Sequence, residues 1–312
     1  MPNQNSHDDA WMQQALDLAV RGQGLVEPNP MVGCVLVKDG TCIGRGWHES
    51  FGGPHAEVHC LKNVSDKEIL EQSILYVSLE PCNIHAKTPP CSDLIISKGI
   101  KTVVIGSSDF NPKVSGKGIT QLEANEISVT KLNLVEKQMK LNISFFINQT
   151  QGEPYIIGKL ALSNDGYISR EDKQVKITTR EIDAISHKLR SSVDAILVGK
   201  KTWLNDNPSL NARLYHTDNQ PGIIVMSKED INLPPSTDDG RTIRQISSSN
   251  PQEIKEDIYK LGYRNVLVEG GAEVFQFFME NGLYHEFTII KNPRLNLENG
   301  LKAPKLDYSQ YS

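Results

Sequence analysis

The sequence lacks a long hydrophobic run, a surplus of positive charge and an even number of cysteines. No apolar stretch approaches the length of about 20 residues that a membrane-spanning helix needs, so we expect no membrane partner. The formal net charge is −5 and neither half is basic, which argues against nucleic acid. The five cysteines are an odd number, and residues 1–10 are polar and acidic rather than apolar. We therefore expect a cytoplasmic protein whose thiols are reduced.

The 312 residues have room for about two domains, each with its own core. The segment at 148–154, Asn-Gln-Thr-Gln-Gly-Glu-Pro, has the composition of a linker. We therefore expect one domain over residues 1–148 and a second over residues 149–312. Both halves combine helical and strand periodicities, so the predicted fold class is α/β.

Hydrophobic spacing and turn residues predict the elements of both halves. In the first half, Asp8 or Asp9 caps a helix whose apolar face carries Trp11, Met12, Ala15, Leu16, Ala19 and Val20. The other elements before the linker are strands at 33–37 and 43–47 joined by a turn at 38–41, a helix at 55–62, a strand at 75–79, a helix at 91–98 and a strand at 102–105. After the linker we expect strands at 155–162, 195–198, 223–226, 265–268 and 286–290, and helices at 179–190, 252–261 and 272–280.

Three short motifs in the first half predict a zinc site. They are His55-Ala56-Glu57, Pro81-Cys82 and Thr88-Pro89-Pro90-Cys91. One imidazole and two thiolates supply the three protein ligands of a catalytic zinc, which leaves a fourth position for a water whose pKa falls to about 7. The carboxylate of Glu57 then acts as the catalytic proton shuttle, without being a ligand. This set of residues indicates hydrolytic deamination of a nucleobase-like ring.

The surrounding residues are compatible with this interpretation. Gly53-Pro54 interrupts the chain just before His55, so Glu57 is expected in the first turn of a helix, and Cys82 follows a predicted strand. The alternative is a structural zinc site, which needs a fourth protein ligand, and His85 is the candidate. The remaining cysteines are interpreted as buried small hydrophobes; they are Cys34, Cys42 and Cys60.

The chain resembles the bifunctional riboflavin-biosynthesis deaminase/reductase family over nearly its whole length. In the first half the resemblance rests on Asn29-Pro30-Met31-Val32-Gly33, His55-Ala56-Glu57-Val58-His59, Leu79-Glu80-Pro81-Cys82 and Lys87-Thr88-Pro89-Pro90-Cys91. In the second half it rests on Lys159-Leu160-Ala161-Leu162-Ser163-Asn164-Asp165-Gly166, Leu197-Val198-Gly199-Lys200-Lys201-Thr202, the stretch from Asp206 to Arg213, and Val268-Glu269-Gly270-Gly271. It implies a cytidine-deaminase-like α/β/α sandwich followed by a dihydrofolate-reductase-like α/β domain.

The resemblance also implies a substrate and its contacts in the first domain. The substrate would be 2,5-diamino-6-(5-phosphoribosylamino)pyrimidin-4-one, a small phosphoribosylated pyrimidine. His55, Cys82 and Cys91 would bind one Zn²⁺ per chain. Asn29 would hold the pyrimidine edge, and Lys87 is the natural cation for the phosphate. The alternative for Lys87 is a solvated surface lysine.

In the second domain the resemblance implies NADPH-dependent reduction of the ribosyl group to ribityl. The implied cofactor contacts are Ala161, Lys176, Thr202, Asp206, Gly270, Gly271 and Ala272. The implied substrate contacts are Leu210, Arg213 and Glu269. A Gly-Gly turn that opens a helix offers N–H groups to a phosphate, although the same pair also makes ordinary tight turns.

The chain departs from the family pattern at three places. Asn83-Ile84-His85-Ala86 stands where Ser-His-x-Gly is usual, and Gln174-Val175-Lys176-Ile177-Thr178 replaces Ser-x-Trp-Ile-Thr. The segment after Leu306 is also short. Three hypotheses therefore stay open: a bifunctional enzyme, a zinc deaminase whose second half is a scaffold or dimerisation module, and a non-catalytic zinc protein that binds a pyrimidine. A homo-oligomer is expected in each case, and the choice between NADPH and NADH is open.

Overall fold

The computed structural model describes residues 4–84, 89–170, 175–215 and 220–303, which form parts of two compact units. The first unit is Met1–Gln151 and the second is Gly152–Ser312. The division lies three residues beyond the predicted one, because helix α7, Ile143–Gln151, continues through the polar residues that suggested a linker. The helix is held by the buried Phe145 and Ile147, so only Gly152, with φ +69°, to Pro154 is left to connect the units.

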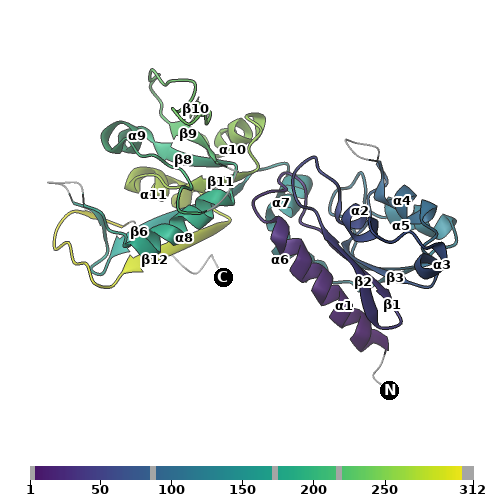
Figure 1. Ribbon diagram of the computed structural model, residues 1–312. Helices are drawn as coiled ribbons and strands as arrows, with labels where there is room; N and C mark the ends of the chain where they lie inside the picture. Colours follow the sequence, from purple (N-terminus) through teal and green to yellow (C-terminus); the bar gives the residue numbers. More distant parts are fainter. Residues whose placement is uncertain (1–3, 85–88, 171–174, 216–219, 304–312) are drawn as a thin grey trace. The chain divides into compact units, whose positions relative to one another are not determined.

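The first unit is built around a five-stranded sheet with the order β2-β1-β3-β4-β5 (Figure 1). Its strands are β1 (Gly33–Lys38), β2 (Thr41–Trp47), β3 (Ile74–Leu79), β4 (Thr102–Ser107) and β5 (Ser128–Lys131). Its helices, besides α7, are α1 (Gln4–Ala19), the short 3₁₀ helix η1 (Val20–Gly22), α2 (Ala56–Leu61), α3 (Lys67–Glu71), α4 (Cys91–Ser97), α5 (Lys117–Ala124) and α6 (Val135–Leu141). β1 pairs antiparallel with both β2 and β3, whereas β3, β4 and β5 are parallel.

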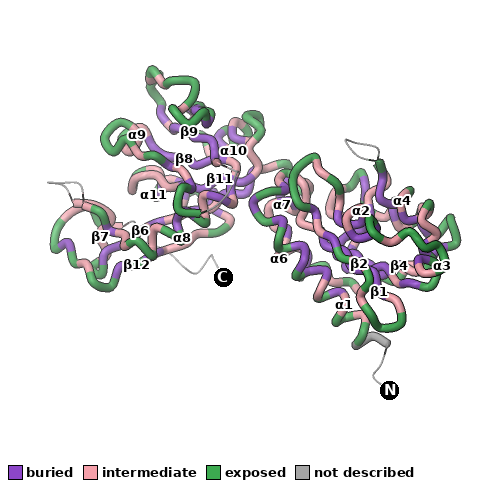
Figure 2. The backbone as a smooth tube through the Cα atoms, in the orientation of Figure 1, coloured by how far each residue is buried: buried purple, intermediate pink, exposed green. Residues whose placement is uncertain are grey.

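Alternation along the strands gives this sheet two apolar faces. Val35, Tyr76 and Val104 face α1, where Met12 and Ala15 are fully buried. The intervening residues face α2, α4 and α5 and pack with side chains of those helices; they include Leu36, Leu75, Val77, Val103 and Ile105. The result is the α/β/α layering that the family resemblance implies, and Figure 2 shows the buried strands in purple between more exposed helices.

The second unit contains a six-stranded, all-parallel sheet with the order β10-β9-β8-β11-β6-β12. Its strands are β6 (Tyr155–Ser163), β8 (Ala195–Gly199), β9 (Gly222–Met226), β10 (Ile243–Ile246), β11 (Asn265–Val268) and β12 (Glu286–Asn292). Two further strands, β7 (Tyr167–Ser169) and β13 (Leu301–Lys302), form a separate antiparallel ribbon. Its helices are α8 (Arg180–Ser191), α9 (Lys200–Asp206), α10 (Pro251–Lys260) and α11 (Ala272–Glu280).

Helices cover both faces of this sheet, as a parallel sheet requires. Ile254, Phe275 and Phe278 bring α10 and α11 onto one face, and Leu189 of α8 lies against the other. Helix α8 begins next to the predicted start at residue 179, where the Thr179 hydroxyl accepts the Ile182 N–H. All carboxyl ends of the parallel strands therefore meet at one edge, where α/β proteins bind ligands.

Three sequence expectations for the first unit are wrong. Helix α1 begins at Gln4, so neither Asp8 nor Asp9 caps it; instead Asp8 accepts a hydrogen bond of 2.7 Å from the Tyr76 hydroxyl. Val20 lies beyond the end of α1 and is 48 % exposed rather than part of the apolar face. Cys42 is only half-buried, because its strand β2 lies at the edge of the sheet.

Within the described residues, no helix has both the length and the apolar character needed to cross a membrane.

Candidate active sites

The three predicted zinc ligands lie together in the first unit, although they are far apart in the chain. The donor atoms of His55, Cys82 and Cys91 all lie within 4.8 Å of one another. The Nδ1 atom of His55 is 3.5 Å from the Cys82 sulfur and 3.3 Å from the Cys91 sulfur. His55 precedes α2, Cys82 follows β3 and Cys91 is the first residue of α4, so three elements contribute one donor each.

These separations match a tetrahedral zinc ion. With a Zn–N bond of about 2.0 Å and a Zn–S bond of about 2.3 Å, tetrahedral geometry separates nitrogen from sulfur by about 3.5 Å. The donor set is also one that zinc prefers. A hydrogen bond with the Cys91 thiol is the main cause that lowers the pKa of Cys82 to about 4. The same bond raises the pKa of Cys91, so metal binding would release a proton from this thiol.

Glu57 lies in the first turn of α2, beside these donors. Glu57 is 3 % exposed, and burial raises its pKa above the usual range. The helix reaches this position because β2 carries glycine beneath it. A Cβ atom on Gly46 would lie 2.3 Å from the Ala56 carbonyl oxygen, and one on Gly44 would lie 2.5 Å from the Cys60 carbonyl oxygen. The backbone of α2 therefore rests directly on the backbone of the strand.

The predicted pyrimidine contact Asn29 is oriented by His48, a residue that the sequence analysis did not select. The Nδ1–H of His48 donates to the Pro54 carbonyl at 3.0 Å, so its Nε2 accepts the Asn29 amide N–H at 3.1 Å. Burial lowers the pKa of His48, which favours this neutral form. The His48 ring also meets the His55 ring edge to face, 5.3 Å between centroids. With its nitrogen engaged, Asn29 offers its amide oxygen to a ligand.

Glu80 is a second residue that the sequence analysis passed over. It is 4 % exposed and directly precedes Pro81-Cys82. Its carboxylate accepts four backbone N–H groups: Oε1 from Gly118 at 2.9 Å and Ile119 at 3.2 Å, and Oε2 from Gly116 at 2.9 Å and Asp109 at 3.2 Å. It therefore fastens the segment 109–119 to the strand end that carries the zinc ligand.

The segment between the two cysteines is only partly described. Ile84, which stands where the family has histidine, is 38 % exposed. His85, the alternative fourth ligand, lies outside the described residues, as do Ala86 and the predicted phosphate contact Lys87.

The second unit contains a cavity of about 1070 Å³ at the carboxyl ends of its central strands. Most of the predicted cofactor contacts line it: Ala161, Thr202, Asp206, Gly270, Gly271 and Ala272. The turn before α11 is tight, because a Cβ atom on Gly270 would lie 2.9 Å from Val274 and one on Gly271 would lie 3.1 Å from the Thr202 hydroxyl. That hydroxyl accepts the Gly271 N–H at 3.1 Å. A cavity of this size with a helix N-terminus in its wall fits a dinucleotide.

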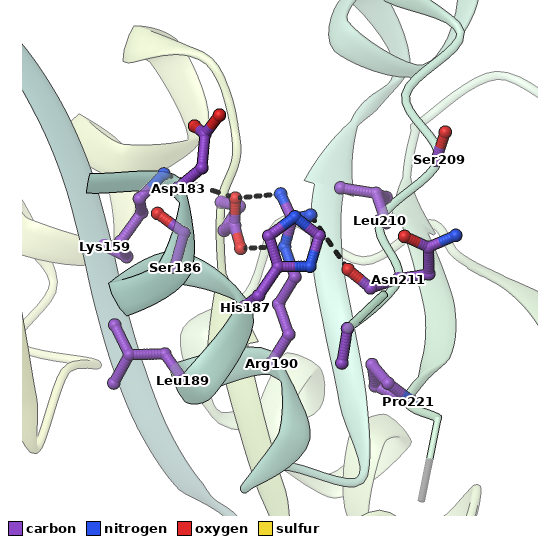
Figure 3. Close-up of polar contacts among 12 residues, drawn as sticks. Lys159, Asp183, Ser186, His187, Leu189, Arg190, Ser209, Leu210, Asn211 and Pro221 are labelled. Atoms are coloured by element: carbon purple, nitrogen blue, oxygen red, sulfur yellow. Dashed lines mark hydrogen bonds and ion pairs between the residues drawn. The ribbon is translucent and has the colours of Figure 1, made fainter. Parts of the chain in front are cut away.

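A buried ion cluster lies in the wall of the same cavity. Arg190 donates to both carboxylate oxygens of Glu269, from Nε at 2.7 Å and from Nη2 at 2.8 Å, and Lys159 is 3.5 Å from the same group. Arg190 also donates to the Asn211 carbonyl at 3.1 Å, a contact that Figure 3 draws. Burial acts to raise the pKa of Glu269, but the charges of Lys159 and Arg190 outweigh it and hold this pKa below its usual range.

Three other predicted contacts do not line the cavity. Leu210 has φ +45°, and its side chain is 3 % exposed and belongs to the core. Arg213 is exposed and donates to the Asn211 side chain at 2.8 Å. Lys176 pairs with Asp183 at 2.5 Å, because a flexible cation at this position finds the carboxylate of α8. Gln174 and the segment 304–312 lie outside the described residues.

Comparison with known proteins agrees with this division into two sites. Residues 5–107 match the cytidine and deoxycytidylate deaminase zinc-binding region, and residues 154–295 match the RibD C-terminal domain. The riboflavin biosynthesis protein RibD of Aquifex aeolicus is 33 % identical over 92 % of this chain and 87 % of its own length. The corresponding protein of Actinobacillus pleuropneumoniae is 36 % identical over 95 % of this chain and 83 % of its own length.

Solved structures show the same similarity. The chain matches RibD of Acinetobacter baumannii with a TM-score of 0.86 and 29 % identity, covering 98 % of this chain and 93 % of that one. It also matches the diaminohydroxyphosphoribosylaminopyrimidine deaminase/5-amino-6-(5-phosphoribosylamino)uracil reductase of Thermotoga maritima, with a TM-score of 0.84 and 33 % identity over 96 % of this chain and 90 % of that one. The chain belongs to the RibD family of riboflavin-biosynthesis enzymes, in which a zinc-dependent deaminase domain precedes an NADPH-dependent reductase domain.

Proposed function

We propose that the first unit hydrolytically deaminates 2,5-diamino-6-(5-phosphoribosylamino)pyrimidin-4-one and that the second unit reduces the ribosyl group of the product to ribityl. The observation that carries the proposal is the placement of the buried Glu57 carboxyl beside three convergent zinc donors. A site that only bound zinc would not need this free carboxyl, whose burial costs folding free energy. We also propose that the enzyme works as a cytoplasmic homo-oligomer without nucleic-acid or membrane partners.

In the deaminase, Glu57 is the group that moves protons. When bound, zinc supplies Lewis-acid activation of the attacking water. Glu57 takes one proton from that water and gives it to the ring nitrogen, then takes the second proton from the new C–OH group and gives it to the leaving amine, so that one water is consumed and ammonia is released. The carboxyl must both accept and donate a proton within one turnover, as a general acid–base group does. Asn29, fixed by His48, accepts a hydrogen bond from an amino group on the pyrimidine edge.

In the reductase, the chain aligns the two reactants. The cofactor supplies the hydride. Lys159 and Glu269 line the cavity where the sugar would meet the cofactor, and Arg190 prevents the carboxylate from rotating by its two-pronged contact. The Gly270-Gly271 turn lets the pyrophosphate of the cofactor approach the start of α11 closely.

A single incubation tests both halves of the proposal. Zinc-loaded protein is mixed with the phosphoribosylaminopyrimidine substrate, with and without NADPH, and ammonia release and nicotinamide absorbance are followed together. We expect ammonia in both samples and equimolar NADPH consumption in the second. Ammonia without NADPH consumption would leave a deaminase with a silent second unit, an outcome that the Lys176–Asp183 pair would then help to explain. No ammonia from any pyrimidine would contradict the deaminase assignment.

A further inference from the structure

We propose that Lys200 and Lys228 bind the 2′-phosphate of NADPH and thereby select it over NADH. The inference rests on the proposed reductase function and adds to it the residues that read the cofactor. Lys200 is the first residue of α9, directly after β8, and Lys228 follows β9. Both residues line the cavity.

The direction in which a dinucleotide lies follows from the sheet order. The reacting end belongs at Lys159 and Glu269, which lie on β6 and directly after β11. The N-terminus of α11 next to it suits the pyrophosphate. β9 is two strands from β11 in the order β9-β8-β11, which is about 10 Å at the usual strand spacing. The adenosine end therefore lies over the ends of β8 and β9, where the ribose 2′ position would meet the lysines.

The local charges at this end support a phosphate rather than a free hydroxyl. In Rossmann-type dinucleotide-binding folds a carboxylate binds the ribose 2′-hydroxyl of NAD, whereas a cation binds the 2′-phosphate of NADP. Lys200 forms an ion pair with Glu229, whose side chain is 76 % exposed. Such an exposed pair is weak, so an arriving phosphate dianion can replace Glu229 as the partner of Lys200. Among the described residues, Lys228 has no ion-pair partner.

The turn that carries Lys228 is fixed without using either lysine. The Ser227 hydroxyl donates to the Glu229 carbonyl at 2.8 Å. The side-chain amide of Gln245 donates to the same carbonyl at 2.8 Å and to the Ser227 carbonyl at 3.2 Å. The backbone is thus held in place without a bond from either lysine, and only the exposed Glu229 must be displaced from Lys200, which is the arrangement that a preorganised anion site needs.

The experiment measures the binding of NADPH and NADH to the full-length protein by titration calorimetry. We expect Lys200→Met and Lys228→Met each to raise the Kd for NADPH by about 10-fold, because each removes one charge-assisted contact, and to leave the Kd for NADH within about twofold. Glu229→Gln should tighten NADPH, since it removes the competing carboxylate. The matched control is Lys201→Met. Lys201 pairs with Glu273 of α11 at 2.5 Å, so this change should shift the Kd values of both dinucleotides by the same factor.

Adenosine 2′-monophosphate and adenosine provide a second readout that does not depend on the nicotinamide. The wild-type protein should prefer the 2′-phosphate, and both lysine variants should lose that preference. Equal shifts for NADPH and NADH in the Lys200 and Lys228 variants would overturn the inference while the reductase proposal stands. Failure of the wild-type protein to bind either dinucleotide would overturn the reductase proposal and this inference with it.

Discussion

Replacing Glu80 by glutamine should open the wall of the deaminase site without changing its zinc donors. The four groups around the carboxylate are all N–H donors, and a carboxylate offers only acceptors. The amide of Glu80→Gln keeps one oxygen, so about two of the four donors lose their partner and face an NH₂ group. A hydrogen bond to a charged group contributes about 1.5–3 kcal/mol. Two of them amount to about 3–6 kcal/mol.

The lower end of this range applies because Asp109 and Gly116 are only half-buried, so water can satisfy their N–H groups in part. We therefore expect the free energy of local opening of the segment 109–119 to fall by about 3 kcal/mol. This corresponds to a loss of about 10²-fold in amide-exchange protection, measured by mass spectrometry on the zinc-loaded protein. Glu123→Gln, at an exposed position of α5, makes the same charge change and should have no effect. Protection within about threefold of wild type in Glu80→Gln would refute the reasoning.

Three other perturbations have defined outcomes. Glu57→Gln should retain zinc by metal analysis but lower the kcat of deamination by about 10²–10⁴-fold, and a variant with more than a tenth of wild-type activity would contradict the proton-shuttle role. His285 accepts the Ile156 N–H at 3.0 Å, and burial lowers its pKa to about 4. Below the ordinary histidine pKa of about 6.5 the unfolded chain binds a proton that the folded chain does not bind. The free energy of unfolding therefore falls as the pH drops from 6.5 toward 4. Because His285 is partly exposed, we expect a loss of about 1 kcal/mol at pH 5 in urea denaturation, which His285→Gln should abolish. Arg190→Met removes the two short hydrogen bonds of the buried Glu269 carboxylate and leaves it only Lys159 at 3.5 Å, so it should destabilise the second unit by about 3 kcal/mol in thermal denaturation. Adding Glu269→Gln should restore at least part of this loss, and no recovery would show that the pair is not coupled.

The sequence predicts best what local pattern and ligand chemistry determine. The three zinc donors could be selected although Cys82 lies 27 residues and Cys91 36 residues after His55. Few residue types bind zinc, and each of the three lies beside a turn or a proline. The long strands and α8, α10 and α11 were predicted for a similar reason, since their periodicity is strong. The short elements α3, β5 and β10 were not predicted, because their sequences KEILE, SVTK and IRQI are mostly polar and so carry too little hydrophobic pattern to detect.

Residues whose function depends on distant partners could not be selected in this way. Its neighbours in the sequence do not distinguish Arg190 from any other helix arginine. Only the fold brings it to Glu269, 79 residues away. The acceptor role of Glu80 depends on N–H groups 29 to 39 residues further along the chain. Leu210 shows the opposite case, because a motif position that suggests ligand contact belongs to a side chain that packs in the core.

The two glycines beneath α2 have a consequence for reading related sequences. Because Gly44 and Gly46 leave no space between strand and helix, any larger residue there would lift Glu57 away from the donor atoms while leaving every chemically active side chain intact. A related chain could keep the His-x-Glu and cysteine motifs but carry bulky residues at both strand positions. Its catalytic glutamate would then lie too far from the zinc donors. A Gly-x-Gly pair in the strand that precedes the motif is thus a separate criterion for catalytic competence.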